Sequence, residues 1–469
     1  KFVLENIPSS AKTLMISFIG MKTVEVGVAP QLTIYLKTDS ETLDEVMVVA
    51  YGSAKKSSFT GSAANIDSKK LELRPITNVT KGLEGQSTGI LTTSGSGQPG
   101  SSASIVIRGF GSINASSNPL YVVDGVPFDG SLSSINPADI ESMTVLKDAS
   151  AGALYGARGA NGVVMITTKG GKEGKANITW RSTVGWSSRA LDEYDMVDGK
   201  DYVQLTYEAI RNSYLFNSGY SWADAESQAR ADLGGNLGGE LYNPFKNYTW
   251  DTIIDPATGQ VKADAQAAWN ERWMDALQRD NALRQEHQLS INGGTDKTKY
   301  MFSLGYLNED GILVTTGFQR YNARANVMSN INHWFKANAN LSLSNSVQNF
   351  SDYSGTSTSN VWYSAQFVSP LFPVYIKDLQ GKDVLDEFGN RQLDYGEQGR
   401  PGSYNDYNPL GGLQDDIADV KNDVASLRTG MTFGSDEESM GIFQGLKLAL
   451  NFGADYRSQL QKSYMNQKI

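Results

Sequence analysis

The stretches SIVIRGFGSINASSNPLYVVDGVPFDG (residues 104–130) and INPADIESMTVLKDASAGALYGARGANGVVMITTK (residues 135–169) decide the fold of this chain. Asn136 and Pro137 fit the cap and the first position of a short helix, and Gly156 fits the end of a second short helix. Short runs of β-branched and apolar residues between turn residues predict strands, and they occur here at 105–107, 120–123 and 163–166. We therefore predict a small α+β domain.

The composition excludes several classes of function. The sequence has no cysteine and only two histidines, His287 and His333, so thiol chemistry is excluded and a histidine-based metal site or catalytic triad is disfavoured. The net charge is −10, whereas a nucleic-acid-binding protein usually carries a basic patch, so this class is disfavoured. No nucleophile–base pair or metal-ligand cluster stands out. We expect neither an enzyme nor a bound cofactor.

The hydropathy pattern fits membrane strands better than membrane helices. Mean hydropathy is −0.35, and no apolar run approaches the roughly 18 residues that a membrane helix needs. A membrane β-barrel alternates lipid-facing and lumen-facing residues, so its average composition is polar. The 22 tyrosines would suit the aromatic girdles of such a barrel.

A period of two residues dominates the chain from residue 176 onward. In the segment 299–307, for example, Tyr300, Phe302 and Leu304 share one face while Met301 and Ser303 share the other. A soluble β-sandwich could show the same alternation, but its inner face would seldom be opposed by rows of Asn, Ser, Lys and Arg. We predict seven membrane strands, near 176–188, 284–293, 299–307, 320–329, 334–346, 424–434 and 445–457.

The connections between these strands alternate in length. Residues 293–297 and 329–333 read as tight turns, whereas 189–283 and 349–418 are too long for the loops of a compact domain. Short turns on one side and long loops on the other are typical of an outer-membrane barrel. We predict a helix over 262–279, whose tryptophan stripe packs against the loops instead of binding a ligand.

The motif order IRG, VVDGVP and IESMTVLKDASA…YGARGANGVVMITTK resembles the plug domain of TonB-dependent outer-membrane transporters, and its KDASA…YGARGANGVV variant resembles the SusC-like (SusC/RagA) branch. The resemblance implies a mainly β protein, with a plug at 59–172 and a transmembrane β-barrel from 173 to 469. Residues 1–38 resemble the C-terminal part of a carboxypeptidase-regulatory-like β-sandwich. Because a plugged barrel has about 22 strands, we expect this chain to be the N-terminal part of a longer one.

Residues 39–58 read as a linker that contains an apolar, β-branched segment flanked by charge and glycine. Its position before the plug resembles that of a TonB box, which stays unpaired at rest and then adds as a strand to a partner's sheet. The alternative is one more strand of the preceding domain. The residues assigned to this segment are Asp44, Glu45, Val46, Met47, Val48, Val49, Ala50, Tyr51 and Gly52.

Several charged plug residues lie beside apolar strands. Buried charges need partners, and the resemblance implies that these residues pair within the plug and with the barrel wall. The alternative is that they are solvated loop charges. The residues are Arg108, Asp124, Glu141, Lys147, Asp148 and Arg158.

The resemblance implies active import of a nutrient across the bacterial outer membrane, energised by TonB and its inner-membrane complex. SusC-like members work with a SusD-like surface lipoprotein that closes as a lid, and a dimer of transporter–lipoprotein pairs is a further expectation. The expected partners therefore include outer-membrane lipid and no nucleic acid.

The expected substrate is an oligosaccharide, with an oligopeptide as the alternative and a non-transporting β-rich surface adhesin as a third possibility. Aromatic residues in the long loops could stack on sugar rings, or they could pack the loops or the lid interface. They are Tyr353, Trp362, Tyr363, Phe367, Tyr404 and Tyr407.

Overall fold

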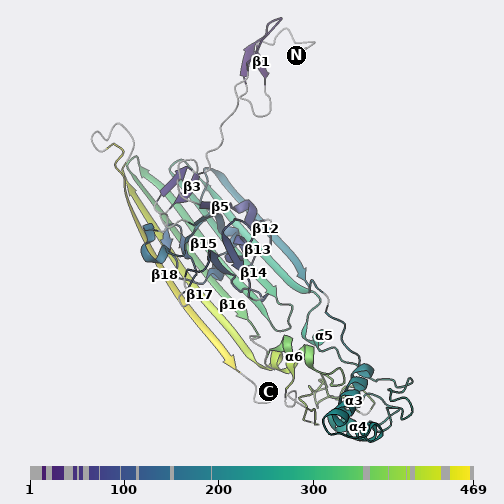
Figure 1. The fold of residues 1–469 in the computed structure, drawn as a ribbon. Helices are drawn as coiled ribbons and strands as arrows, with labels where there is room; N and C mark the ends of the chain where they lie inside the picture. Colours follow the sequence, from purple (N-terminus) through teal and green to yellow (C-terminus); the bar gives the residue numbers. More distant parts are fainter. Residues whose placement is uncertain are drawn as a thin grey trace.

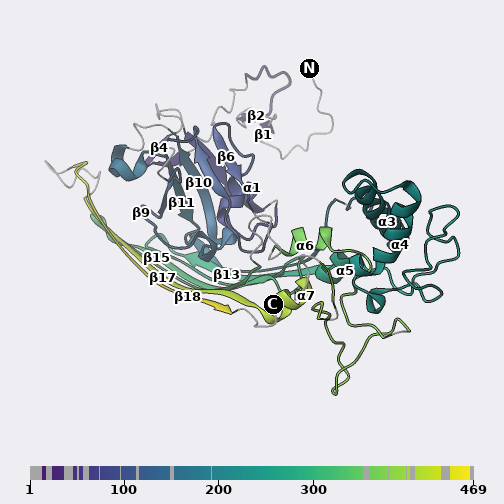
Figure 2. The same ribbon diagram turned by 60° about the horizontal axis from the view of Figure 1, so that its bottom comes forward.

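A computed structural model of the chain contains a curved sheet of seven long strands with a smaller domain on its concave side (Figures 1 and 2). We call the large sheet the wall and the smaller domain, residues 63–168, the plug. The structure describes residues 13–16, 24–35, 46–49, 52–55, 63–72, 74–95, 97–111, 116–147, 153–191, 193–351, 360–378, 380–397, 399–401, 407–434 and 444–464.

The wall consists of consecutive antiparallel strands, each paired with its sequence neighbours. The seven predicted strands are all present, and each is longer than or similar to its predicted segment. They are β12 (Gly174–Ser187), β13 (Ala282–Gly294), β14 (Thr298–Asp310), β15 (Gly317–Asn332), β16 (Phe335–Asn349), β17 (Ile417–Phe433) and β18 (Leu448–Tyr464).

The two faces of the wall differ in polarity as the sequence pattern predicts. Phe302 and Leu304 of β14 are exposed on the outer face, whereas Ser303 between them is buried and donates a hydrogen bond to Asp139 of the plug. Successive residues of a strand point to opposite faces. The concave face is therefore polar where it meets the plug, and the convex face is apolar.

Aromatic side chains bound the apolar outer band at both ends. At one end Phe335 stacks on Phe433 with ring centroids 4.8 Å apart, and at the other Tyr306 contacts Tyr321 at 5.0 Å. Tyr321 lies opposite Asn345 in the sheet, ten residues beyond Phe335 on β16. At about 3.3 Å per residue and a tilt of about 40°, this distance corresponds to about 25 Å, the height of the apolar band of outer-membrane barrels.

The plug is built on a five-stranded sheet of order β5-β10-β11-β8-β9, in which only β11 and β8 are parallel. Its core contains Ile66, Ile140, Met143, Val145 and Ile166, all at most 1% exposed. The strands are β5 (Ala63–Asp67), β8 (Leu120–Val123), β9 (Val126–Pro127), β10 (Ile140–Leu146) and β11 (Val163–Thr168), with a separate pair β6 (Ile90–Thr93) and β7 (Ser104–Ile107).

Short helical turns connect the plug strands. Asn136 caps one of them by accepting a hydrogen bond from the Ala138 backbone N–H at 3.1 Å, with Pro137 at the first position, as predicted. Gly156 has a φ of 61° and a non-helical backbone, so it ends the helical turn that begins at Ala153, as predicted, and a second turn follows it. The predicted start of this helix, residues 148–152, lies outside the described residues. The helices are α1 (Ser68–Glu72), η2 (Val79–Leu83), η3 (Leu132–Ser134), η4 (Pro137–Asp139) and η5 (Ala153–Gly159).

The two long connections of the wall pack together into one outer module, residues 188–281 and 360–416, which we call the loop module. Figure 1 shows its helices beyond one end of the wall. The pair α3–α4 was not predicted. The helices are α3 (Gly199–Phe216), α4 (Trp222–Asn236), η6 (Glu240–Tyr242), α5 (Trp273–Leu277), α6 (Val361–Phe367) and α7 (Pro409–Asp415).

The helix predicted over 262–279 is wrong except for α5. Trp269 and Trp273 donate their indole N–H groups to the backbone oxygens of Leu371 and Phe372, about 100 residues away. The backbone N–H of Ala268 likewise bonds to the oxygen of Pro244. Tertiary pairing has replaced helical hydrogen bonds here, and the predicted packing role of the tryptophans is confirmed because both are buried.

Two short hairpins precede the plug. One pairs β1 (Thr13–Ile16) with β2 (Val24–Gly27), within the region predicted as a β-sandwich remnant. The other pairs β3 (Val46–Val49) with β4 (Gly52–Lys55). None of the helices in the described ranges is long and apolar enough to cross a membrane.

A charge in the middle of the outer band should destabilise the full-length protein in lipid. Leu341→Arg places a guanidinium near the centre of the band, where the cost is about 2–4 kcal/mol, whereas Val347→Arg lies beyond the Tyr306–Tyr321 row and should cost about 0–1 kcal/mol. Denaturant titration after refolding into lipid vesicles measures both free energies of unfolding. Equal costs would contradict a membrane position for this band.

Candidate functional site: the plug–wall interface

Arg320 of β15 joins the wall to two separate segments of the plug. Its side chain is 1% exposed, and Nη1 donates to the backbone oxygens of Thr77 and Ser133, both at 3.0 Å. Nη2 donates to Oδ1 of Asn136 at 3.2 Å. The planar guanidinium fork suits this set of acceptors because its N–H groups point in several fixed directions. A wall cation is thus satisfied mainly by plug carbonyls.

Asp139 at the end of η4 makes the complementary contact from plug to wall. The residue is 5% exposed, and its Oδ1 accepts hydrogen bonds from Gln288 at 2.9 Å and from Ser303 at 2.8 Å. Its Oδ2 accepts a longer bond from Asn322 at 3.3 Å. Three wall strands therefore hold one plug carboxylate through neutral donors.

Asp124 connects the β8–β9 turn to the wall. Its backbone has a φ of 47°, in the left-handed region that Asp tolerates better than most residues. The carboxylate accepts from the Thr168 backbone N–H at 2.9 Å and pairs with Arg324 of β15 at 3.2 Å. Asn340 of β16 also donates to it. The side chain of Asp124 thus links two plug strands to two wall strands.

The plug–wall interface around Arg324 contains polar atoms without hydrogen-bond partners. A cavity of about 40 Å³ lies between plug and wall and is lined by Asp124, Arg324, Asn340 and Ser344 among others. Within the described part of the chain, Nε of Arg324, Oδ1 of Asn340 and Oγ of Ser344 are buried without a hydrogen-bond partner. Buried polar atoms beside such a space are typical water sites. The plug–wall interface is therefore polar in this region, not apolar.

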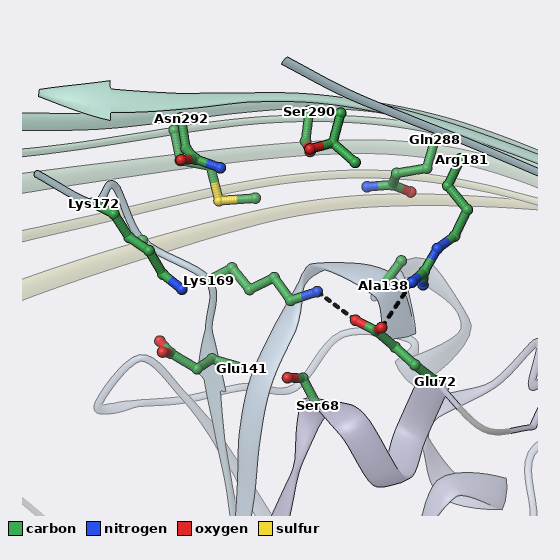
Figure 3. Close-up of a pocket in the computed structure, with 13 residues that line it drawn as sticks. Ser68, Glu72, Ala138, Glu141, Lys169, Lys172, Arg181, Gln288, Ser290 and Asn292 are labelled. Carbon is green, nitrogen blue, oxygen red and sulfur yellow. Dashed lines mark hydrogen bonds and ion pairs between the residues drawn. The ribbon is translucent and has the colours of Figure 1, made fainter. Parts of the chain in front are cut away.

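A larger cavity of about 270 Å³ separates α1 from the wall (Figure 3). Glu72 at the end of α1 pairs with Lys169 at 2.9 Å and with Arg181 of β12 at 2.8 Å. Burial tends to raise the pKa of Glu72, but the hydrogen bonds and charges of Arg181 and Lys169 outweigh it and hold the pKa below its ordinary value. Other lining residues are Ser68, Ala138, Glu141, Gly170, Lys172, Thr179, Gln288, Ser290, Asn292 and Met301.

Comparisons with known proteins agree with this architecture. The family model described as the TonB-dependent Receptor Plug Domain matches residues 55–163. The TonB-dependent receptor SusC of Bacteroides thetaiotaomicron is 31% identical over 98% of this chain. The chain is a SusC-like TonB-dependent receptor homologue.

The SusC-like chain spans less than half of the proteins that it matches. It covers 42% of the length of SusC, and 36% of the TonB-dependent receptor P39 of Formosa agariphila, to which it is 26% identical over 97% of its own length. A solved structure of the RagAB peptide importer in its open-open state covers 88% of the chain, with a TM-score of 0.65 and 26% identity, and the chain covers 42% of it. The wall is therefore part of a receptor barrel in the outer membrane, and the relatives are receptors and importers, not enzymes.

The charged plug residues of the SusC-like chain have different surroundings. Asp124 meets the wall through its ion pair with Arg324. Lys147 donates to Thr88 O at 2.6 Å within the plug, and Arg158 pairs with Asp129 in an exposed ion pair. Arg108 and Glu141 are exposed, and Asp148 lies outside the described residues.

The main plug–wall contacts, Arg320 and Asp139, were not predicted. Asp139 lies in the quoted motif PADIES, and Arg320 belongs to the inward-facing row of a predicted strand. The signal available in the sequence was a charged residue in the inward-facing row of a strand for Arg320 and a charged residue in a short turn for Asp139.

The assigned TonB-box segment is paired in part. Val46–Val49 forms β3 and pairs with β4, which begins at Gly52, so the prediction of an unpaired segment is wrong for these residues and for Gly52. β3 also lies close to β10 and β11 of the plug sheet, so the hairpin is not isolated. Asp44, Glu45, Ala50 and Tyr51 lie outside the described residues.

The aromatic residues proposed for substrate binding mostly pack the loop module. Trp362 is half-buried beneath Arg189, with 5.9 Å between the guanidinium carbon and the ring centroid. Tyr363 contacts Phe367 at 4.5 Å between ring centroids, and burial raises the pKa of Tyr407 to about 12. Tyr353 and Tyr404 lie outside the described residues.

A buried ion pair that was not predicted joins the two halves of the loop module. Arg400 and Asp394, whose side chains are 0% and 4% exposed, pair at 2.9 Å, and Tyr242 donates to Asp394 at 3.1 Å. Arg400 also donates to the Tyr407 backbone oxygen. The first long connection supplies Tyr242 and the second supplies Asp394 and Arg400, so this network fixes one connection against the other.

Replacing Arg320 should loosen the plug without disturbing the wall. Arg320→Met leaves the buried oxygens of Thr77 and Ser133 without donors, which costs about 1–3 kcal/mol. Hydrogen exchange of residues 131–139 in the full-length protein should then accelerate roughly 10–100-fold. Arg428→Met is the matched control because Arg428 pairs with Asp455 of the wall. Unchanged protection of residues 131–139 in Arg320→Met would contradict the proposed anchor.

Proposed function

We propose that the full-length protein imports a nutrient oligomer across the outer membrane with work supplied by TonB. The observation that carries this proposal is the polar contact between plug and wall through Arg320, Asp139 and Asp124. Hydrogen bonds to protein can be exchanged for hydrogen bonds to water at a small net cost, so a plug seated in this way closes the barrel and still responds to tension. A plug held by an immobile apolar contact would not respond to tension.

The proposed energy input enters through residues 44–52. This segment precedes the plug, and its strand β3 is held by β4 in a four-residue hairpin. Opening the hairpin exposes an extended, β-branched strand that adds to a sheet edge of TonB. Tension applied there passes to β5, the first strand of the plug.

We propose an oligosaccharide as the substrate class. A cleft of about 770 Å³ in the loop module offers exposed aromatic rings, Tyr194 at 95% and Phe367 at 55% exposure, for stacking on sugar rings. Charged residues in the same cleft, Arg189, Glu193 and Arg272, suit an oligopeptide as the second candidate, because peptides carry charged ends. The similarity to the RagAB peptide importer also favours this second candidate.

The proposed partner outside the cell is a SusD-like surface lipoprotein that covers the loop module. The similarity to SusC and to RagAB supports this partner. Purification of the full-length protein in mild detergent, followed by a mass measurement, identifies the lipoprotein and tests whether two transporter–lipoprotein pairs form a dimer.

Deleting residues 44–52 should abolish energised uptake while leaving the barrel assembled. Growth on the transported oligomer is expected to stop, because tension no longer reaches the plug. Surface labelling of the loop module and resistance of the barrel to protease should match those of the unmodified protein. Normal growth of the deletion strain would refute TonB-dependent import and would favour the non-transporting adhesin.

A further inference from the structure

A furrow of about 350 Å³ crosses the outer face of the wall, on the side away from the plug. Its floor contains Ala323 and Ala325 of β15, two small residues that are half-buried. Larger apolar side chains of the two neighbouring strands, each 42–58% exposed, lie opposite this floor and form the sides. They are Phe302 and Leu304 of β14 and Leu341 and Leu343 of β16.

The furrow continues toward β18. A second cavity, of about 530 Å³, shares Leu304, Ala323 and Leu343 with the first. It passes over Ala425 of β17 and reaches Tyr456 of β18, which lies opposite Ala425 in the sheet. The two cavities therefore form one continuous depression across β14 to β18, which we call the outer furrow.

The outer furrow ends at a line of polar side chains. Tyr321, Asn345 and Asp423 lie opposite one another on β15, β16 and β17, two residues closer to the loop module than the apolar lining. The Asn345 amide donates to the Asp423 carboxylate, and Lys421 pairs with the same carboxylate at 3.8 Å. Hydroxyl, amide and charged groups thus begin where the apolar lining stops.

Stacked rings extend this line across the neighbouring strands. Ring centroids are 5.0 Å apart between Tyr306 and Tyr321, 6.1 Å between His287 and Tyr306, and 6.0 Å between Trp180 and His287. We call these four residues the aromatic row. Aromatic side chains at this level of a membrane protein lie at the boundary between acyl chains and headgroups, and their ring faces can also contact sugar rings.

The outer furrow lies in the half of the outer band that faces the outside of the cell. β15 begins beside the loop module at Gly317 and ends at the short turn after Asn332, so Tyr321 is closer to the loop module than Ala325. Outer-membrane barrels have long extracellular loops and short periplasmic turns. Figure 2 shows the plug on the concave side of the wall, so it does not cover the convex face, where the furrow lies.

We propose that the outer furrow binds one acyl chain of a sugar lipid of the outer leaflet, whose sugar contacts the aromatic row. A chain in the furrow has side chains beneath it and on both sides, and so makes more dispersion contacts than a chain on a flat surface. Tyr321, Asn345 and Lys421 suit the hydroxyl, amide and phosphate groups of an acylated sugar. This inference does not depend on the proposed import.

A photoreactive lipid tests this site. The probe is purified lipid A with a photoreactive group on one acyl chain, in phosphatidylethanolamine nanodiscs that each hold one full-length protein. We expect the label on residues 302–304, 323–325 and 341–343 to exceed that on the rest of β14 to β16 by about tenfold. Phosphatidylethanolamine that carries the same photoreactive chain should label the outer face of these strands evenly, because it has no sugar for the aromatic row.

Filling the outer furrow should remove this label. Ala323→Leu combined with Ala325→Leu should lower labelling by lipid A about tenfold, because the added side chains occupy the place of the acyl chain. The matched control, Ala337→Leu with Ala339→Leu, adds the same side chains to the outer face of β16 near its short turn and should leave the labelling unchanged. Heat-modifiable migration in gel electrophoresis checks that each variant is assembled.

Tyr321→Ala tests the sugar contact while the apolar lining stays as it is. The loss of one ring from the aromatic row should lower labelling by lipid A roughly 2–10-fold. Labelling by phosphatidylethanolamine should not change. This variant also tests the proposal if the filled furrow prevents assembly.

Even labelling by lipid A, or equal labelling of the outer furrow by both lipids, would overturn the proposal. Unchanged labelling of the filled variant would also overturn it. A second copy of the chain is the other candidate occupant. In that case crosslinks between copies would form over the furrow in membranes, and lipid A would label the single copies in nanodiscs evenly.

Discussion

The guanidinium of Arg320 is the contact on which the seating of the plug most depends. Removing a charge from water costs several kcal/mol unless hydrogen bonds replace its hydration. Here the replacement comes from two plug segments that are distant in sequence, one at Thr77 and the other at Ser133 and Asn136. The guanidinium of Arg320 therefore has these hydrogen-bond partners only when the plug is in place. Asp139 meets the same requirement in the opposite direction, since a plug carboxylate relies on wall donors.

The inside of the plug and its outer surface are held by different forces. The plug core buries residues such as Ile66, Met143 and Val145, and full burial of an apolar side chain contributes about 1.5–3 kcal/mol. A neutral hydrogen bond across the plug–wall interface contributes about 0.5–1.5 kcal/mol net, and water can replace it. The plug is therefore more cohesive within itself than toward the wall.

Much of the architecture could be predicted because wall strands obey a local rule. The alternation of Phe302 and Leu304 with Met301 and Ser303 specifies both a strand and its two faces, so the strands and their orientation were predictable. The short turn predicted at 293–297 is present between β13 and β14, whereas the one predicted at 329–333 lies at 333–334, because β15 continues to Asn332. The local sequence could not exclude a helix over 262–279, because the hydrogen-bond acceptors of Trp269 and Trp273 lie in the other long connection.

The anchors of the plug are harder to predict than its fold. A period of two places Arg320 and Arg324 on the inward face but does not reveal which of them meets plug carbonyls and which meets Asp124. Glu141, Arg108 and Arg158 have the same residue types as true anchors, yet they are exposed. Only the three-dimensional position of each turn relative to the wall separates these cases.

An experimental structure of the full-length protein in a lipid nanodisc tests most directly whether a polar, wall-held plug closes the barrel. We predict that β12 to β18 form consecutive strands of a closed barrel around residues 63–168. We also predict that Arg320 bonds to the oxygens of Thr77 and Ser133. A plug that lies outside the barrel, or one whose contact with β13–β16 is apolar with Arg320 facing solvent, would contradict this.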